Sequence, residues 1–377
     1  MLNNSFIYTL IVLSCLLITS CSNSETNRPQ EPQKPYPYNE ENVYYKNSNA
    51  GITLAGTLTY PKKDGEFPAV ILITGSGAQD RDATSADHRP FLVLADYLTR
   101  HGIAVLRSDD RGVGKSEGTY GVYTTTTNKD LVLDIFAAFN YLQSREEINE
   151  NKIGLIGHSG GGLVGAMVAA ELPVVAFIVS LAGPGLNGCE TLCQQVNHVG
   201  KSLGINAELI NKYQVMLKQS FKILQNTPQK ENAHAELINK YQKFLLKMSD
   251  SDRITLEKIG FGCPKDPNKW GDALMMPAFN EFFMLDPKTI LKQVKCPILV
   301  LNGEKDLQVI PDENLNAIEM ALVEGSNPDY TIKRFPGLNH LFQECRTGSP
   351  IEYERIEETI SPLVLEVIKD WIYKHVN

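Results

Sequence analysis

The chain has 377 residues, 42% of them hydrophobic, so it is long enough to bury a large core in one domain or two. Its formal net charge is −8, and it contains no long run of Lys and Arg. Because phosphate binding needs a concentrated basic surface, this composition argues against nucleic acid as a partner.

The first residues have the pattern of an export signal. Phe6 to Ile18 is an apolar run, too short for an ordinary membrane-spanning helix but typical of a signal peptide. It ends in Ile18-Thr19-Ser20-Cys21, which resembles the cleavage box of bacterial lipoproteins. We therefore predict a signal peptide at residues 1–20, a lipid on Cys21 and an extracytoplasmic protein anchored to a bacterial membrane. No Lys or Arg precedes Arg28, so a plain cleaved signal and an uncleaved anchor remain alternatives.

The next segment, residues 21–42, is polar and contains four prolines, at positions 29, 32, 35 and 37. Such a segment cannot bury enough apolar surface to fold and favours an extended backbone. We interpret it as a tether, with the folded domain over residues 43–377.

From residue 43 onward, short apolar runs alternate with amphipathic segments. A hairpin is expected first, over 43–60, with its turn at Asn49-Ala50-Gly51. The alternation that follows predicts βαβ units, hence a mostly parallel sheet with helices on both faces. The expected strands are 69–74, 103–107, 153–156, 174–181, 297–301 and 330–335, and the expected helices are 90–100, 128–142, 162–172, 312–323 and 362–373.

The segment from about 186 to 294 contains no comparable strand and is rich in helix-forming residues. It carries an internal repeat, because Ala207–Gln214 and Ala235–Gln242 both read A-E-L-I-N-K-Y-Q. Two copies are too few for a solenoid, so a pair of related helices is expected. Inserted between strands, this segment would form a helical lid over the strand ends. Its apolar residues either line a pocket or pack beneath it: Met275, Met276, Phe279, Phe282 and Phe283.

Ser159 stands in the run K-I-G-L-I-G-H-S-G-G-G, residues 152–162. An expected strand ends just before the serine and an expected helix begins just after it, which is the context in which G-x-S-x-G presents a nucleophilic hydroxyl. Gly157 and Gly161 would let the strand and the helix approach closely around a strained turn. His158 is expected to brace the turn.

A serine nucleophile needs a base and a group that orients the base. In the α/β-hydrolase arrangement an acid and then a histidine follow the serine along the chain. Asp306 comes after the strand P-I-L-V-L, and His340 follows the strand at 330–335. Glu304 and Asp312 are the alternative acids.

Acyl chemistry also needs donors for the oxyanion. The backbone N–H of Gly160 is one candidate, and the loop Thr74-Gly75-Ser76-Gly77 offers the second, with Ser76 preferred to Gly77. The alternative is that these glycines only make a turn.

Neither a metal nor a cofactor is expected. Cys189, Cys193 and His198 have helical spacing and lack a fourth ligand, which disfavours a metal site. An oxidising compartment would permit disulfides among Cys189, Cys193, Cys263 and Cys345, whose connectivity the sequence cannot supply.

Five motifs together make the chain similar to serine α/β-hydrolases of the bacterial dienelactone-hydrolase-like and carboxylesterase type. They are I-T-G-S-G-A-Q-D-R-D (73–82), R-S-D-D-R-G-V-G-K-S (107–116), G-H-S-G-G-G (157–162), L-N-G-E-K-D-L-Q-V (301–309) and P-G-L-N-H-L-F-Q (336–343). The resemblance implies an α/β-hydrolase fold and a triad of Ser159, Asp306 and His340. Similar sequences often carry an acidic residue where this chain has Gly160.

The expected function is therefore hydrolysis of small carboxylic esters through an acyl-enzyme, without a cofactor. A serine peptidase or a thioesterase could use the same triad. An alternative of another class is a non-catalytic surface-binding lipoprotein. The sequence leaves the oligomeric state open.

Overall fold

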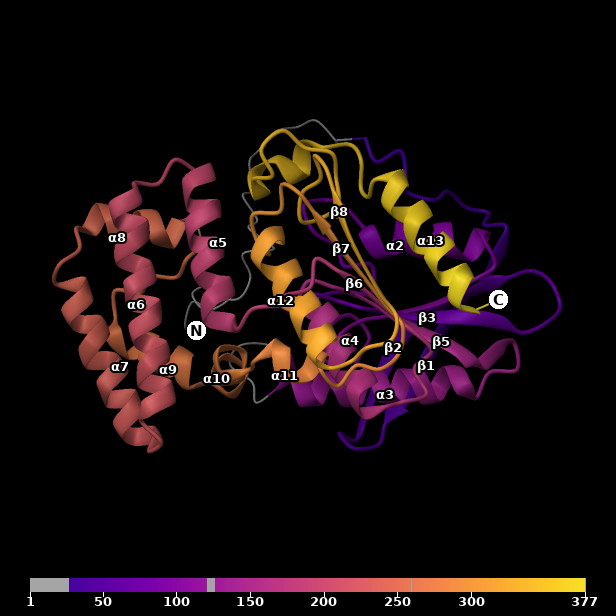
Figure 1. The fold of residues 1–377 in the computed structure, drawn as a ribbon, viewed down its shortest axis with the longest axis horizontal. Helices are drawn as coiled ribbons and strands as arrows, with labels where there is room; N and C mark the ends of the chain where they lie inside the picture. The colour runs from indigo at the N-terminus through magenta and orange to yellow at the C-terminus, as the bar shows by residue number, and fades with distance from the viewer. Residues whose placement is uncertain (1–26, 121–125, 259, 377) are drawn as a thin grey trace.

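The computed structural model describes residues 27–120, 126–258 and 260–376. Its centre is an eight-stranded sheet in the order β1-β2-β4-β3-β5-β6-β7-β8 (Figure 1). The first two strands form the predicted hairpin, which pairs antiparallel with β4, and all the other pairs are parallel. The strands are β1 (Tyr38–Asn47), β2 (Ile52–Pro61), β3 (Phe67–Ile73), β4 (Ala104–Ser108), β5 (Ile148–His158), β6 (Ile178–Leu181), β7 (Ile298–Gly303) and β8 (Tyr330–Phe335).

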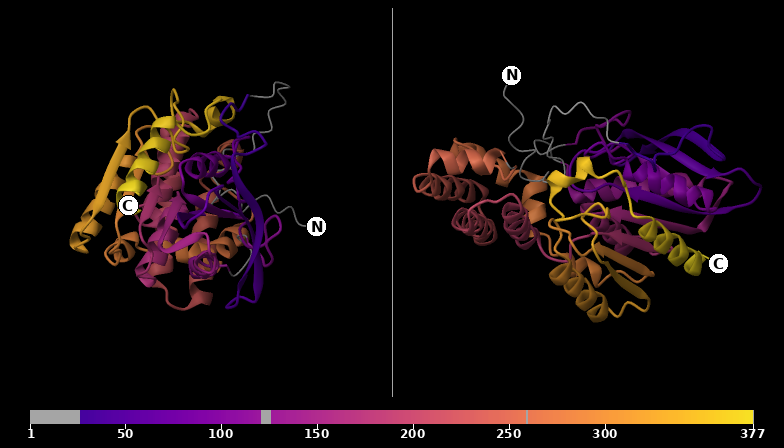
Figure 2. Two further views of the ribbon diagram at one scale, coloured as in Figure 1. Left: turned by 90° about the vertical axis from the view of Figure 1, so that its right-hand side faces the viewer. Right: turned by 90° about the horizontal axis from the view of Figure 1, so that it is seen from above.

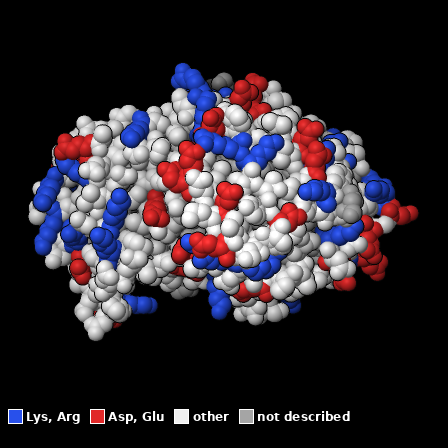
Figure 3. Space-filling view, in the orientation of Figure 1, with Lys and Arg blue, Asp and Glu red and all other residues white. Residues whose placement is uncertain are grey.

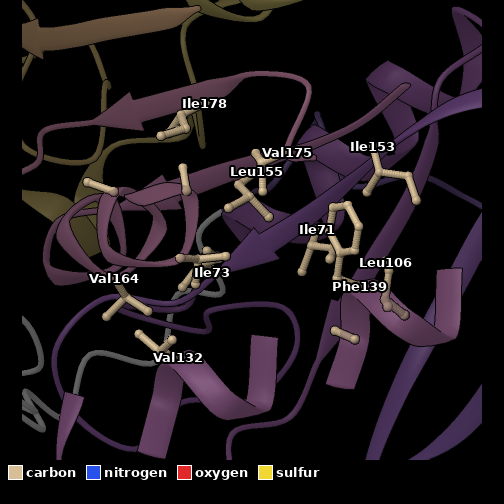
Figure 4. Packing of buried hydrophobic residues seen from close by; sticks show 14 of the residues in the cluster. Ile71, Ile73, Leu106, Val132, Phe139, Ile153, Leu155, Val164, Val175 and Ile178 are labelled. Atoms are coloured by element: carbon tan, nitrogen blue, oxygen red, sulfur yellow. The ribbon is translucent and has the colours of Figure 1, made fainter. Parts of the chain in front are cut away.

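Helices cover both faces of the sheet, because each face of a parallel sheet is apolar and must be buried. Side chains of α2 (Pro90–Arg100) and α13 (Pro362–Val376) join the apolar cluster on one face. The other face packs against α3 (Asn128–Gln143), α4 (Gly160–Glu171) and α12 (Pro311–Glu324). In this second cluster, Ile71, Leu155 and Ile178 from neighbouring strands lie near Val132 and Val164 of the helices (Figure 4). The predicted α/β-hydrolase fold is confirmed.

The segment between β6 and β7 forms the helical insertion predicted from the sequence. It extends from one end of the molecule and has an apolar cluster of its own (Figures 1 and 2). Phe279 and Phe283 are fully buried in that cluster, and Met275, Met276 and Phe282 pack against it, so all five belong to the core of the insertion. Its helices are α5 (Gly188–Ser202), α6 (Ala207–Asn226), α7 (Lys230–Leu245), α8 (Asp250–Lys258), α9 (Pro267–Met275), α10 (Pro277–Met284) and α11 (Pro287–Leu291).

The duplicated octapeptide begins α6 and lies in the middle of α7. Its two tyrosines contact the same side chain: Tyr241 stacks on Trp270 with ring centroids 4.6 Å apart, and Tyr213 meets Trp270 edge-on at 6.2 Å. The Tyr213 hydroxyl donates to Gly262 O at 3.0 Å and the Tyr241 hydroxyl to Pro264 O at 3.0 Å. The repeat therefore supplies both aromatic walls around one buried tryptophan and fixes the loop after α8.

A half-buried carboxylate joins the insertion to the core domain. Glu281 of α10 accepts a hydrogen bond from the backbone N–H of Asn128, the first residue of α3, at 2.6 Å. Burial raises the pKa of Glu281, and the Asn128 N–H opposes that rise.

In the view of Figure 3, charges of both signs are interspersed over the core, whereas Lys and Arg gather on the outer end of the insertion.

The folded chain begins earlier than the predicted boundary at residue 43. Tyr38 already starts β1 and is buried, and Arg28 donates to the carbonyls of Ala86 at 3.2 Å, Glu354 at 2.8 Å and Ile356 at 2.6 Å. Composition alone favours an extended tether here, but these carbonyls come from distant parts of the chain, and the bonds to them offset the entropic cost of ordering this segment.

The predicted signal peptide and Cys21 lie outside the described residues. Among the described helices, none has the length and apolarity needed to cross a membrane.

Candidate active site

Ser159 occupies the sharp turn between β5 and α4. Its backbone angles, φ 53° and ψ −122°, are unusual for a residue with a side chain and mark local strain. Its N–H donates to Leu181 O of the neighbouring strand β6 at 2.7 Å, which holds the turn at the carboxyl edge of the sheet. The turn therefore presents the serine where ligands bind in open α/β sheets.

The two glycines flanking Ser159 are required by space. A Cβ on Gly157 would lie 2.1 Å from Gly161 O, and a Cβ on Gly161 would lie 2.3 Å from Ile73 O. Both contacts are with backbone atoms, which cannot turn aside as a side chain can. The prediction that these glycines permit a close strand–helix approach is confirmed.

Asp306 and His340 follow the adjacent parallel strands β7 and β8, and both are buried. His340 Nδ1 lies 2.7 Å from Asp306 Oδ2. The other carboxylate oxygen, Oδ1, accepts from the backbone N–H groups of Gln308 and Val309 at 2.7 and 2.9 Å. Since an ionised carboxylate only accepts, Nδ1 carries the proton and Nε2 is left with a free lone pair.

His340 Nε2 is buried and has no hydrogen-bond partner among the described residues. In this structure it is therefore not bonded to the Ser159 hydroxyl. Such catalytic hydrogen bonds are often long without substrate and tighten in the complex. A buried acceptor without a partner costs free energy, which favours a role for this atom in the reaction.

The alternative acids have other partners. Glu304 accepts from the backbone N–H of Gly337 at 3.0 Å, and Asp312 pairs with Arg334 at the surface. Of the three carboxylates, Asp306 alone contacts the His340 ring.

His158 connects the serine turn to the loop that bears His340. Its Nε2 lies 3.0 Å from His340 O, and the two rings are 4.8 Å apart. Burial, together with the neighbouring His340, lowers the pKa of His158 to about 3. A neutral His158 can donate from Nε2 to the carbonyl, as expected of a residue that braces the turn.

The two expected oxyanion donors lie against each other. A Cβ on Gly160 would be 2.6 Å from Ser76 Oγ and 3.3 Å from Ser76 N. No described residue accepts a hydrogen bond from either amide. This geometry supports the preference for Ser76 over Gly77.

Two family models match separate parts of the chain. Residues 88–258 match the model described as serine aminopeptidase, S33, and residues 281–369 match that of the dienelactone hydrolase family. The solved structure of PA2218 from Pseudomonas aeruginosa superposes with a TM-score of 0.54 at 18% identity, covering 95% of this chain and 99% of that one. The chain has the α/β-hydrolase fold.

Curated relatives resemble this hydrolase over much of its length. Esterase EstD of Thermotoga maritima is 26% identical over 324 residues, which cover 85% of the hydrolase and 66% of EstD. YtaP of Bacillus subtilis is 32% identical over 152 residues, covering 37% of the hydrolase and 47% of YtaP. The hydrolase thus spans less than two thirds of either relative.

Sequence reasoning missed Asp110, which lies behind the oxyanion loop of the hydrolase. Its carboxylate accepts hydrogen bonds from Thr74 and Gln79 of that loop. Part of the signal lies in the sequence, because Asp110 follows the expected strand at 103–107, but only the structure shows that this strand pairs with β3, whose end leads into the loop.

The described cysteines of the hydrolase are all free thiols, so none of the possible disulfides is present. Cys189 and Cys193 are neighbours on α5 and are buried.

Proposed function

We propose that this α/β-hydrolase cleaves carboxylic esters through an acyl-enzyme, with Ser159, His340 and Asp306 as its triad. The observation that carries the proposal is the His340 ring, which is bonded to a buried carboxylate through Nδ1 while Nε2 remains without a partner. That arrangement suits a general base.

In the proposed reaction, Ser159 Oγ attacks the ester carbonyl while His340 Nε2 accepts the hydroxyl proton. The amides of Ser76 and Gly160 donate to the oxyanion of the tetrahedral intermediate. As the intermediate collapses, the alcohol leaves with the proton from the imidazolium. Water then attacks the acyl-enzyme with the same histidine as base, releasing the acid and restoring Ser159. Asp306 stays ionised and stabilises the imidazolium.

Substitution Ser159→Ala tests the proposal. We expect kcat for p-nitrophenyl acetate to fall by more than about 10³-fold with an unchanged melting temperature, because loss of the nucleophile removes the acyl-enzyme route. Ser144→Ala is a matched control, since Ser144 caps α3 at the surface. A fluorophosphonate should label wild-type protein at Ser159 and leave the variant unlabelled. Folded wild-type protein that is not labelled would favour the non-catalytic alternative.

A serine peptidase is the second candidate, because the family model matching residues 88–258 is described as a serine aminopeptidase. The same triad can cleave amides. Comparing kcat/KM on p-nitrophenyl acetate, an acyl thioester and an aminoacyl-anilide separates the candidates. We expect kcat/KM to be highest on the ester. A higher kcat/KM on the anilide would indicate that the site cleaves peptides.

A further inference from the structure

We propose that Asp110 is a positioning residue for the oxyanion loop, Thr74 to Gln79, and acts on catalysis by holding both ends of that loop. The inference rests on the proposed ester hydrolysis, because it concerns the N–H of Ser76 within the loop.

Asp110 reaches the loop because of the sheet register. Strands β3 and β4 are parallel neighbours, and Leu72 pairs with Arg107. The loop leaves the end of β3 and Asp110 follows the end of β4, so both lie at the carboxyl edge of the sheet.

Three hydrogen bonds join Asp110 to the loop. The Thr74 hydroxyl donates to Oδ1 at 2.7 Å, and the N–H of Gln79 donates to Oδ2 at 2.9 Å. In return, the Asp110 N–H donates to Gln79 O at 3.1 Å. One residue thus fixes the first and the last position of the loop and sets the distance between them.

The contact continues from Gln79 to the proposed donor. Gln79 Nε2 donates to Ser76 O at 3.3 Å. The carbonyl and the N–H of Ser76 lie in the two peptide planes that meet at its Cα, so a bond that holds the carbonyl restricts the direction in which the N–H points. Such fixed donors stabilise an oxyanion without reorganising during the reaction.

The neighbouring Asp109 has a different task. Arg81 donates to it from Nε at 3.0 Å and pairs with its other oxygen, and the backbone N–H of Lys115 also bonds to it at 3.1 Å. Asp109 therefore anchors Arg81 and the turn after β4, while Asp110 serves the loop.

Either protonation state of Asp110 can hold the loop. Burial raises its pKa to about 7, helped by the nearby Asp134 and Asp109 and opposed by the bonds from Thr74 and Gln79. The ionised carboxylate accepts both bonds. The protonated carboxyl can donate to Thr74 Oγ1, whose hydroxyl rotates to accept, and still accept from Gln79. An asparagine has the same pattern, one donor and one acceptor.

The test compares Asp110→Ala with Asp110→Asn in the full chain. Asp110→Ala removes both acceptors, so we expect kcat for p-nitrophenyl acetate to fall at least 10-fold with KM changed less than about threefold, because the oxyanion exists only in the transition state. Asp110→Asn should keep kcat within about threefold. If Asp110→Ala does not fold, the double variant Asp110→Asn with Thr74→Val replaces it. Valine has no hydroxyl, so the side-chain amide of Asn at position 110 loses its hydrogen-bond acceptor at the start of the loop.

A second readout separates positioning from stability. A trifluoromethyl ketone forms a tetrahedral adduct with the serine, and its inhibition constant should rise by the factor by which kcat falls. Asp134→Asn is the control, since Asp134 pairs with Arg111 and does not contact the loop; it should lower the melting temperature and leave kcat unchanged. Wild-type kcat in Asp110→Ala, or equal losses in the Ala and Asn variants, would overturn the inference. Absence of turnover and of fluorophosphonate labelling in wild-type protein would instead refute the proposed function.

Discussion

Gly160→Ala is a direct test of the proposed oxyanion site. The new methyl group would start 2.6 Å from Ser76 Oγ and 3.3 Å from Ser76 N, so the serine must move away from its present position. Loss of one oxyanion donor typically costs about 10²- to 10³-fold in kcat, or roughly 3–4 kcal/mol of transition-state stabilisation. We expect a loss in this range for Gly160→Ala, with little change in KM.

Unfolding would not explain such a loss. Gly160 is the first residue of α4 and does not adopt a left-handed backbone conformation, so alanine is sterically acceptable to the helix. Alanine in a helix is favoured over glycine by roughly 0.5–1 kcal/mol, and the melting temperature should stay the same or rise.

The matched experiment is a double-mutant cycle with Ser76→Gly, which removes Oγ and Cβ but keeps the backbone N–H. Ser76→Gly alone should keep kcat within a few-fold, and in the Gly160→Ala background it should restore most of the lost rate. Initial rates on p-nitrophenyl acetate and thermal melts measure both effects. Full activity in Gly160→Ala, or no recovery in the double variant, would refute the assignment of Ser76.

Asp306→Asn should lower kcat by about 10⁴-fold without unfolding the protein, because the amide no longer selects the reactive tautomer of His340. Asp312→Asn, at the surface, serves as the control, with kcat measured at saturating ester. Equal losses of kcat in the two variants would contradict the choice of Asp306. Buried His88 contributes a pH dependence of stability. Burial lowers its pKa to about 4, from 6.5, so its contribution is full above pH 6.5 and is lost as the pH falls through 4. Thermal melts from pH 7 to pH 4 should show a shallower decline for His88→Gln than for wild type, and parallel curves would rule this out.

The sheet and its covering helices were predictable because their signals are local. Buried parallel strands are nearly continuous apolar runs, and the expected strand at 297–301 overlaps β7, whose residues are all buried. The N-terminal segment was not predictable in this way. Arg28 donates to the carbonyls of Glu354 and Ile356, which lie more than 300 residues later in the chain. No local sequence pattern predicts such distant partners.

In the candidate site, too, the residues marked by local signals were predictable and the contacts between distant segments were not. Ser159, Asp306 and His340 each follow a predicted strand, and parallel strands bring their carboxyl ends to one edge, so the sequence could place all three. The contacts of Asp110 with Thr74 and Gln79 depend instead on the side-by-side order of β3 and β4, which chain order does not specify.

His158 shows how the two kinds of information combine. Its place before Ser159 is fixed by the motif, but its environment comes from the fold, which places its partly buried ring 4.8 Å from the His340 ring. Because the pKa of His158 is lowered to about 3, the ring is neutral near pH 7 and adds no positive charge beside the proposed base. A charged His158 would oppose the imidazolium that forms on His340 as it accepts the serine proton. The same burial that lets His158 hold the His340 backbone therefore also keeps a like charge away from the proposed base.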